Sequence, residues 1–195
     1  MGKATINSEF ATIGSHMAKS DSFFIRSIVN TDAAGNYAQE EIDLGSFVNL
    51  GVKSSTLLRI HNIQVQYADG TTAAGPSPEL PMSSQAAGGG KIAWQVCTQS
   101  QTSLVTADDK SLVSCGSMTM YGDDTAAHAI SATHDFDVNP QQWTNGYLVG
   151  VDTLFFGGEA GGTVTSGDSV VAIVMECTLE NATQASATAL ALSQQ

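Results

Sequence analysis

Residues 169–183 read SVVAIVMECTLENAT, the most apolar run of the chain. Side chains at alternate positions of a strand point to the same side. One side of this run is wholly apolar, whereas the other becomes polar only from Glu176 onward. The pattern predicts a central strand of a sandwich whose first half is covered on both sides and whose second half meets water on one. Glu176, Glu180 and the short length argue against a transmembrane segment, which needs about 20 apolar residues. The apolar side consists of Val171, Ile173, Met175, Cys177 and Leu179.

Further strand-like blocks fill the chain from residue 22 onward, with Gly, Pro, Asn and Asp turns between them and few helical patterns. Counting the blocks predicts about eight strands in an all-β fold, an antiparallel β-sandwich that covers residues 22–181. The remaining blocks lie at 22–30, 37–48, 56–70, 91–100, 111–121 and 144–162.

The block at 56–70 changes phase along its length. Its apolar residues occupy even positions at first and odd positions afterwards, so the slip near His61 and Asn62 predicts a β-bulge. The two sets are Leu58 and Ile60, then Ile63, Val65 and Tyr67.

Residues 69–91 hold three of the four prolines and a triple glycine. This composition predicts a long loop, a candidate for surface contacts. Gly88-Gly89-Gly90-Lys91 is interpreted as the flexible end of that loop rather than as a phosphate-binding motif.

The first segment, residues 1–21, lacks sustained periodicity. Two interpretations stay open, because Gly14-Ser15-His16-Met17 resembles a protease and cloning scar. The segment is either an expression leader or a native N-terminal arm that needs a surface to lie on.

The C-terminal tail, residues 182–195, contains the one plausible helix, at 182–192, with Thr183 as its N-cap. A helix of this length is marginal by itself and must dock on something. We expect the tail to leave the sandwich and reach a neighbouring copy.

Composition limits the possible partners. The chain of 195 residues is 42% hydrophobic but only 13% charged, against roughly 25% charged residues in a typical domain. A surface so poor in charge favours contact with neighbours. The net charge of −12, with 19 acidic and seven scattered basic residues, argues against coating a nucleic acid.

Cysteine spacing excludes two common frameworks. Cys97, Cys115 and Cys177 give an odd count without a C-x-x-C pair, so neither a set of disulfides nor a zinc knuckle is indicated. Their strand-like surroundings favour buried free thiols, although one pair could still form a bridge.

The residues between 123 and 140 are the best candidates for a metal site, because carboxylates in a loop suit Ca²⁺. Asp135-x-Asp137-x-Asn139 begins like a calcium loop, but Pro140 stands where the turn requires glycine, and the twelfth position has no glutamate. We therefore expect a solvated acidic loop and no metal. The other candidate ligands are Asp123, Asp124, His128 and His134.

No catalytic signature accompanies these residues. The chain lacks a G-x-S-x-G elbow and a phosphate-binding P-loop, and no cysteine lies in a recognisable Cys-His setting. The neighbouring carboxylates Glu40-Glu41 and Asp108-Asp109 would point to opposite faces of a strand. We therefore expect no enzyme, no catalytic residues, no cofactor and no small-molecule substrate.

The two tryptophans are expected to differ. Trp94 lies in the alternating run KIAWQVC and is expected in the core. Trp143 follows Asn139-Pro140 on a predicted loop, where it suits either a sugar-binding face or an interface anchor.

Taken together, the chain resembles viral coat proteins of the single jelly-roll type, in which eight antiparallel strands form two facing sheets. The resemblance lies in texture and strand count over three segments, FFIRSIVNTDAAGNYAQEEIDLG (23–45), NPQQWTNGYLVGVDTLFFGG (139–158) and SVVAIVMECTLENATQASATALALSQQ (169–195). Jelly rolls also serve as lectins and cupin enzymes, but the cupin histidine pattern is absent.

The resemblance implies a structural virion protein, a capsid subunit that assembles with copies of itself and with other virion proteins. One departure concerns the genome: only Lys3 and Lys19 precede residue 25, so the basic arm of many coat proteins is missing and direct contact with nucleic acid is not expected. Either a membrane or another basic protein lies beneath the shell, or the subunit decorates a capsid rather than building one. The alternative is a carbohydrate-binding or adhesin-like sandwich on a cell or virion surface.

Overall fold

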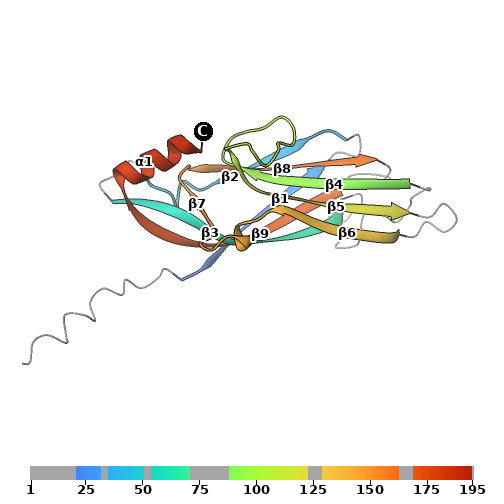
Figure 1. Cartoon of the computed structure of the whole chain (residues 1–195), viewed down its shortest axis with the longest axis horizontal. Helices are drawn as coiled ribbons and strands as arrows, with labels where there is room; N and C mark the ends of the chain where they lie inside the picture. Colours follow the sequence, from blue (N-terminus) through green and yellow to red (C-terminus); the bar gives the residue numbers. More distant parts are fainter. Residues whose placement is uncertain are drawn as a thin grey trace, which may run out of the picture.

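The computed structural model describes residues 21–31, 35–50, 54–70, 88–122, 129–162 and 169–194. In these residues the chain forms nine strands in two antiparallel sheets, followed by one helix (Figure 1). The strands are β1 (Phe23–Thr31), β2 (Ala38–Asp43), β3 (Ser54–Asp69), β4 (Gly88–Cys97), β5 (Leu112–Gly122), β6 (Ala129–Val138), β7 (Tyr147–Val149), β8 (Thr153–Gly162) and β9 (Ser169–Thr183). A 3-10 turn, η2 (Pro140–Gln142), precedes β7, and the helix is α1 (Gln184–Ser193).

The strand order is that of a jelly roll. One sheet runs β1-β9-β3-β7 and the other runs β2-β8-β4-β5-β6. Without the additional edge strand β6, the strands pair symmetrically about the β4–β5 turn: β4 pairs with β5, β3 with β7, β2 with β8 and β1 with β9. The chain is thus one long hairpin rolled into two facing sheets, which confirms the predicted all-β sandwich.

Strand β9 lies between β1 and β3, as the opening sequence pattern predicts. Its inner side is almost completely buried, from Val171 to Cys177, with Leu179 packed at the margin. The outer side differs from the prediction: Val170 is buried, but Ala172 and Val174 are only half-buried, like Glu176. The outer side of β9 is therefore partly open from Ala172 onward in the described structure.

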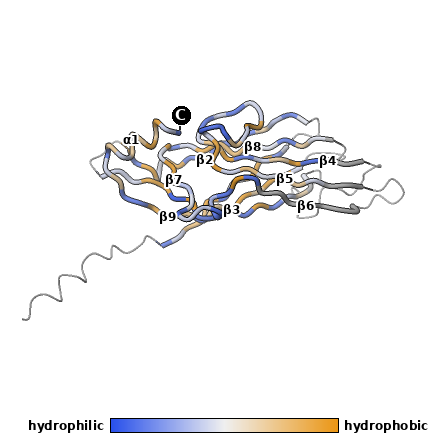
Figure 2. The backbone as a smooth tube through the Cα atoms, in the orientation of Figure 1, coloured by the Kyte–Doolittle hydropathy of each residue, from blue (hydrophilic) through white to orange (hydrophobic). Residues whose placement is uncertain are grey.

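The core fills the space between the two sheets, where the hydrophobic stretches of the strands face each other (Figure 2). Trp94 is 1% exposed, which confirms its predicted core position, and its indole Nε1 donates to the Tyr67 hydroxyl over 2.9 Å. Its ring meets Phe156 edge to face at 6.5 Å. The buried indole N–H is thus satisfied, as a core tryptophan requires.

The predicted bulge is confirmed on β3, where the register with β9 shifts between Ile60 and Asn62. Beyond the bulge, the side-chain amide of Gln141 replaces a strand partner: it accepts from Ile63 N at 3.3 Å and donates to Ile63 O at 3.2 Å. Gly146 closes this segment with a φ of +64°, and a Cβ there would lie 2.3 Å from Ile60 O. Only glycine fits such an approach.

Two expectations about loops are wrong. The polar stretch around His134 forms strand β6 over residues 129–138, because it completes the ladder with β5 despite its weak apolar alternation. Residues 88–91 begin strand β4 instead of ending a flexible loop, because all four pair with β5, and Gly90 and Lys91 pair with β8 as well. The rest of the predicted loop, from residue 71 to 87, lies outside the described residues.

Helix α1 begins where the sequence predicts, with the Thr183 hydroxyl accepting from Ser186 N at 3.2 Å. It docks on its own domain at one end of the sandwich (Figure 1), with Ala187 fully buried. The tail therefore folds back instead of leaving the sandwich for a neighbour. No helix in the described part of the chain is long and apolar enough to cross a membrane.

The buried side chain of Gln194 fixes the end of this helix. Its Oε1 accepts from Gly150 N at 2.8 Å, and its Nε2 donates to Leu148 O at 2.7 Å. The backbone oxygen of Gln194 accepts from the Thr98 hydroxyl at 2.6 Å. Gln194 thereby connects the helix to the segments beside β4 and β7.

Candidate functional site

The candidate metal ligands do not gather in the described residues, where no cluster of three or more His, Cys, Asp or Glu side chains is found. Asp137 is exposed, whereas Asn139 is buried and its Oδ1 accepts from the Ser114 hydroxyl at 2.7 Å. His134 and Asp135 lie in β6, in a part of that strand whose side chains are not described. Asp123, Asp124 and His128 lie outside the described residues.

His61 serves a structural contact in the described structure. Its Nε2 lies 2.8 Å from the Thr178 hydroxyl on the neighbouring strand. Two residues earlier in β3, Arg59 forms an ion pair with Glu180, donates from a second nitrogen to the same carboxylate at 2.7 Å and donates to Asn145 O at 2.5 Å. These contacts hold β3, β9 and the segment before β7 together.

The paired carboxylates do not form a catalytic pair. Glu40 and Glu41 are both exposed on the edge strand β2. Asp108 and Asp109 lie in the loop between β4 and β5, where Asp109 accepts from both the hydroxyl and the backbone N–H of Ser111, at 2.6 and 2.8 Å. These two hydrogen bonds lower the pKa of Asp109, since they favour its charged form.

The three cysteines are free thiols, as the sequence favours. Cys97 and Cys177 are buried, and burial raises the pKa of each thiol to about 12. Burial also raises the pKa of Cys115. Because the thiolate is the reactive form, such thiols suit packing rather than chemistry.

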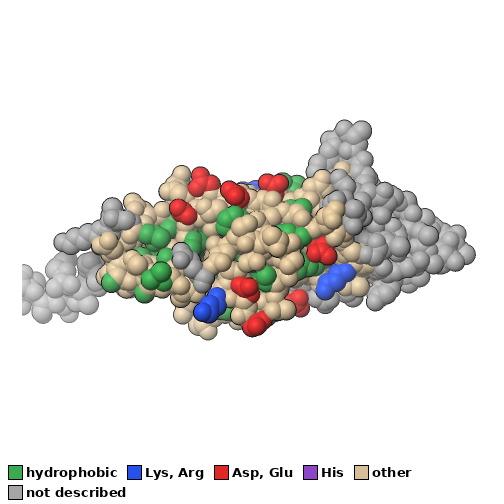
Figure 3. All heavy atoms as spheres, turned by 90° about the horizontal axis from the view of Figure 1, so that it is seen from above, with side chains coloured by type: hydrophobic (Ala, Val, Ile, Leu, Met, Phe, Trp, Pro, Cys, Tyr) green, Lys and Arg blue, Asp and Glu red, His purple; other side chains and the backbone are tan. Residues whose placement is uncertain are grey.

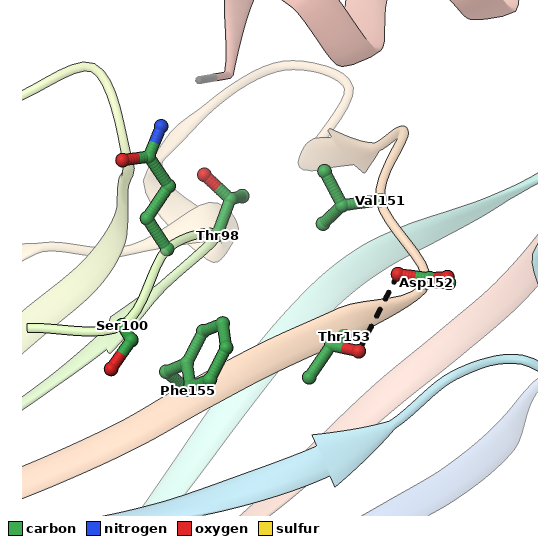
Figure 4. Close-up of a pocket in the computed structure, with 7 residues that line it drawn as sticks. Thr98, Ser100, Val151, Asp152, Thr153 and Phe155 are labelled. Carbon is green, nitrogen blue, oxygen red and sulfur yellow. Dashed lines mark hydrogen bonds between the residues drawn. The ribbon is translucent and has the colours of Figure 1, made fainter.

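One open depression, of about 470 Å³, lies at the end of the sandwich next to α1 (Figure 4). The half-buried ring of Phe155 lies beside Ser100 on one side and Thr153 on the other. Asp152 supplies the only carboxylate of its lining, and neither histidine nor cysteine contributes. The depression offers an apolar ring with polar groups around it and no set of groups for acid–base or nucleophilic chemistry.

Strand β1 carries the most conspicuous exposed apolar side chains. Phe24 is 54% exposed and Ile28 is 49% exposed, and both project from the outer face of an edge strand. Arg26 lies between them, with its guanidinium carbon 5.8 Å from the centre of the Phe24 ring. Half-buried Ala172 and Val174 continue this apolar area on the adjacent strand β9.

The other three sheet edges are protected in the ways that natural proteins use against unwanted pairing. Strand β7 has only three residues, and β2 carries exposed acids. Strand β6 carries the exposed acid Asp137 near its end. Strand β1 has none of these protections: it has one charge, no proline and an uninterrupted nine-residue register with β9.

Trp143 lies at the opposite edge of the same sheet and is 52% exposed, tilted against Tyr147 with ring centres 6.2 Å apart. It directly follows η2, whose Gln141 binds the edge of β3. The sheet β1-β9-β3-β7 therefore exposes apolar side chains at both of its lateral edges. This is the candidate functional surface, and we call its two parts the β1 edge (Phe24, Arg26, Ile28) and the Trp143 edge.

Sequence reasoning identified Trp143 but missed the β1 edge. A signal was present, because the run FFIRSIVNT has large apolar residues on both of its sides, although Arg26 and Asn30 interrupt the outer one. Charge is sparse elsewhere on the surface as well: the face in Figure 3 shows a few acidic and basic side chains scattered among uncharged groups.

No family model matches the chain, and no curated protein matches it. Among solved structures, it is similar to VP1 of Trichodysplasia spinulosa-associated polyomavirus in complex with GM1 oligosaccharide, with 8% identity, a TM-score of 0.46 and coverage of 81% of this chain and 94% of that one. Apo VP1 of New Jersey polyomavirus matches with 10% identity, a TM-score of 0.39 and coverage of 84% and 100%. A Desmodium yellow mottle tymovirus chain matches with 7% identity, a TM-score of 0.31 and coverage of 84% and 89%.

These neighbours are jelly-roll viral coat proteins. The jelly-roll fold of this chain rests on its own strand order. The features of the chain that bear on its function are the exposed side chains of the β1 edge and the Trp143 edge.

Proposed function

We propose that the chain is a structural subunit that assembles in many copies into a viral shell. The observation that carries the proposal is the exposure of apolar side chains at two opposite edges of one sheet, Phe24 and Ile28 at the β1 edge and Trp143 at the other. Aromatic side chains of this kind are typical anchors of protein interfaces.

Two separate contact surfaces matter because a single two-fold contact ends with a dimer. Growth into a larger closed assembly needs at least one further contact elsewhere on the subunit. The β1 edge and the Trp143 edge lie on opposite sides of the sheet, so a subunit can contact different neighbours through them at the same time.

The partners in this proposal are copies of the chain and other virion proteins, and the proposed location is the virion. Contact with the genome is not part of it, since a net charge of −12 opposes binding to phosphates. The chain has neither a catalytic role nor a cofactor in this proposal.

Assembly is tested by sedimentation velocity across a wide range of concentrations, combined with negative-stain microscopy. We expect discrete species larger than a dimer, or closed particles. Trp143→Lys should reduce growth beyond the dimer, whereas Gln184→Lys, on the exposed start of α1, should not. A chain that stays monomeric or dimeric at high concentration would refute the proposal.

Carbohydrate binding is the second candidate, favoured by the depression beside Phe155. Aromatic rings next to hydroxyl and carboxylate groups suit the apolar and polar faces of a sugar. A monomeric chain that binds specific glycans on an array, and loses binding in Phe155→Ala, would favour this function over the shell.

A further inference from the structure

We propose that β1 pairs with β1 of a second copy, so that two four-stranded sheets join into one continuous eight-stranded sheet across a two-fold axis. This inference deepens the proposed function, on which it rests, by naming one of the contacts between subunits. The pairing is antiparallel and centred on Ser27.

Strand β1 has the features of an edge that pairs with another strand. Strand β1 is the last strand of its sheet, and its nine residues keep an unbroken register with β9, so the strand is straight enough to template another. A long edge with exposed apolar side chains and little charge is the type that pairs with other strands. Phe24 and Ile28 are about half exposed on it.

Length, charge and apolar character favour β1 of the second copy as the partner strand. Pairing with β2 of another copy would place Glu40 and Glu41 against the apolar side chains of β1 and remove their carboxylates from water, which is costly. Strand β7 has three residues and cannot cover nine. Strand β1 itself matches in length and in apolar character, and its one charge is positive in a chain whose net charge is −12.

The geometry of an antiparallel sheet and the position of Arg26 favour a register centred on Ser27. In a continuous antiparallel sheet, directly opposite residues point to the same face, so the two-fold axis must pass through a residue position. Centring on Ser27 overlaps all nine residues of both strands. It places Arg26 opposite Ile28 of the second copy, whereas centring on Arg26 would place two like charges opposite each other.

Cross-linking at the axis tests this geometry. In Ser27→Cys the two introduced cysteines lie directly opposite each other. Opposite residues of antiparallel strands have Cα atoms about 4.5–5.5 Å apart, and this separation lies within the range of a disulfide. The matched control is Asn30→Cys, also on β1, whose two copies lie six residues apart along the strand, about 20 Å. We expect a covalent dimer on a non-reducing gel for Ser27→Cys and none for Asn30→Cys, with the wild type as control for the native cysteines.

Charge reversal tests the register separately from loss of apolar area. Ile28→Lys faces Arg26 of the second copy and should suppress both association and the Ser27→Cys cross-link. Ile28→Glu removes the same apolar side chain but faces the same arginine with opposite charge, so association should persist. Leu192→Lys, on the exposed side of α1, should leave association unchanged. Circular dichroism verifies that each variant is folded.

The outcomes separate this pairing from the proposed function. Large particles formed by the wild type, with no cross-link in Ser27→Cys, would overturn the pairing and leave the shell standing. Cross-linked dimers that never grow would overturn the shell and leave the pairing standing. Equal effects of Ile28→Lys and Ile28→Glu would overturn the register.

Discussion

Gln194 is the residue whose substitution tests most directly how the C-terminal helix is held. Its side chain is 4% exposed and joins Gly150 N and Leu148 O, at 2.8 and 2.7 Å. Gln194→Ala removes both hydrogen bonds and leaves the buried N–H of Gly150 and the partly buried carbonyl of Leu148 without these partners. Each such group costs about 1–3 kcal/mol, so we expect the free energy of unfolding to fall by about 2–4 kcal/mol.

The assay is equilibrium unfolding in urea, followed by circular dichroism and by tryptophan fluorescence. The matched control is Gln184→Ala, the same chemical change at the exposed start of the same helix, which should stay within about 0.5 kcal/mol of the wild type. A loss below about 0.5 kcal/mol in Gln194→Ala would refute the reasoning. It would mean that the helix is held by apolar contacts, such as that of buried Ala187, rather than by Gln194.

Gln194→Glu refines the same test. A carboxylate still accepts from Gly150 N but cannot donate to Leu148 O, so the variant should be less stable than the wild type at neutral pH. Burial raises the pKa of such a carboxyl group. Stability relative to the wild type should therefore recover as the pH falls through that raised pKa, and a deficit independent of pH would contradict this account.

Three further predictions concern the core, one turn and the thiols. Ile173→Asp should abolish soluble folding, because an unpaired carboxylate would enter a site that is 1% exposed, whereas Ile28→Asp should give soluble folded protein; soluble yield and circular dichroism compare them. Gly146→Ala should lower the melting temperature, since a Cβ at φ +64° would meet a backbone oxygen at 2.3 Å; an unchanged transition would contradict the described turn. Cys97 and Cys177 should react slowly with iodoacetamide at pH 8 until the chain is unfolded. Because their folded pKa of about 12 exceeds the ordinary 9.0, stability is retained below pH 9 and is lost as the pH rises from 9 to 12; rapid native labelling would refute their burial.

Local signals were enough to predict much of the fold. The alternation in 169–183 predicted a central strand, the phase slip at His61 and Asn62 predicted the bulge, and Thr183 was predicted as an N-cap. Each of these features depends on residues that are close in sequence. Each was therefore visible before any tertiary contact was known.

Features that depend on distant residues were not predictable in the same way. The docking of α1 requires Gln194 to meet Gly150, 44 positions earlier, and no local pattern indicates that pair. Strand β6 is formed by pairing with β5 rather than by its own propensity, so its polar sequence favoured a loop. Tertiary context decides such cases, because strand propensity depends strongly on the neighbouring strands.

The two candidate surfaces also differ in how the sequence signals them. Trp143 stands out as a large aromatic residue on a predicted loop, whereas Phe24 and Ile28 look like ordinary members of a strand. A strand that is apolar on both sides is expected to be covered on both sides. Strand β9 carries apolar residues on both sides at the centre of its sheet, whereas β1 carries them at the edge, where its outer side also includes Arg26 and Asn30.

That contrast favours an interface at β1 over a defect in packing. The inner side of β1 is used within the chain, with Val29 buried and Phe23 stacked on Phe47 at a ring distance of 4.9 Å. The outer side carries Phe24 and Ile28 alternating with the polar residues Arg26 and Asn30. About half of the area of Phe24 and Ile28 remains exposed. The chain places acids on β2 and on β6, so it has the means to protect an edge. An edge strand with a single charge, whose outer side exposes two large apolar side chains that the described chain leaves uncovered, has the composition of a surface that a second copy completes.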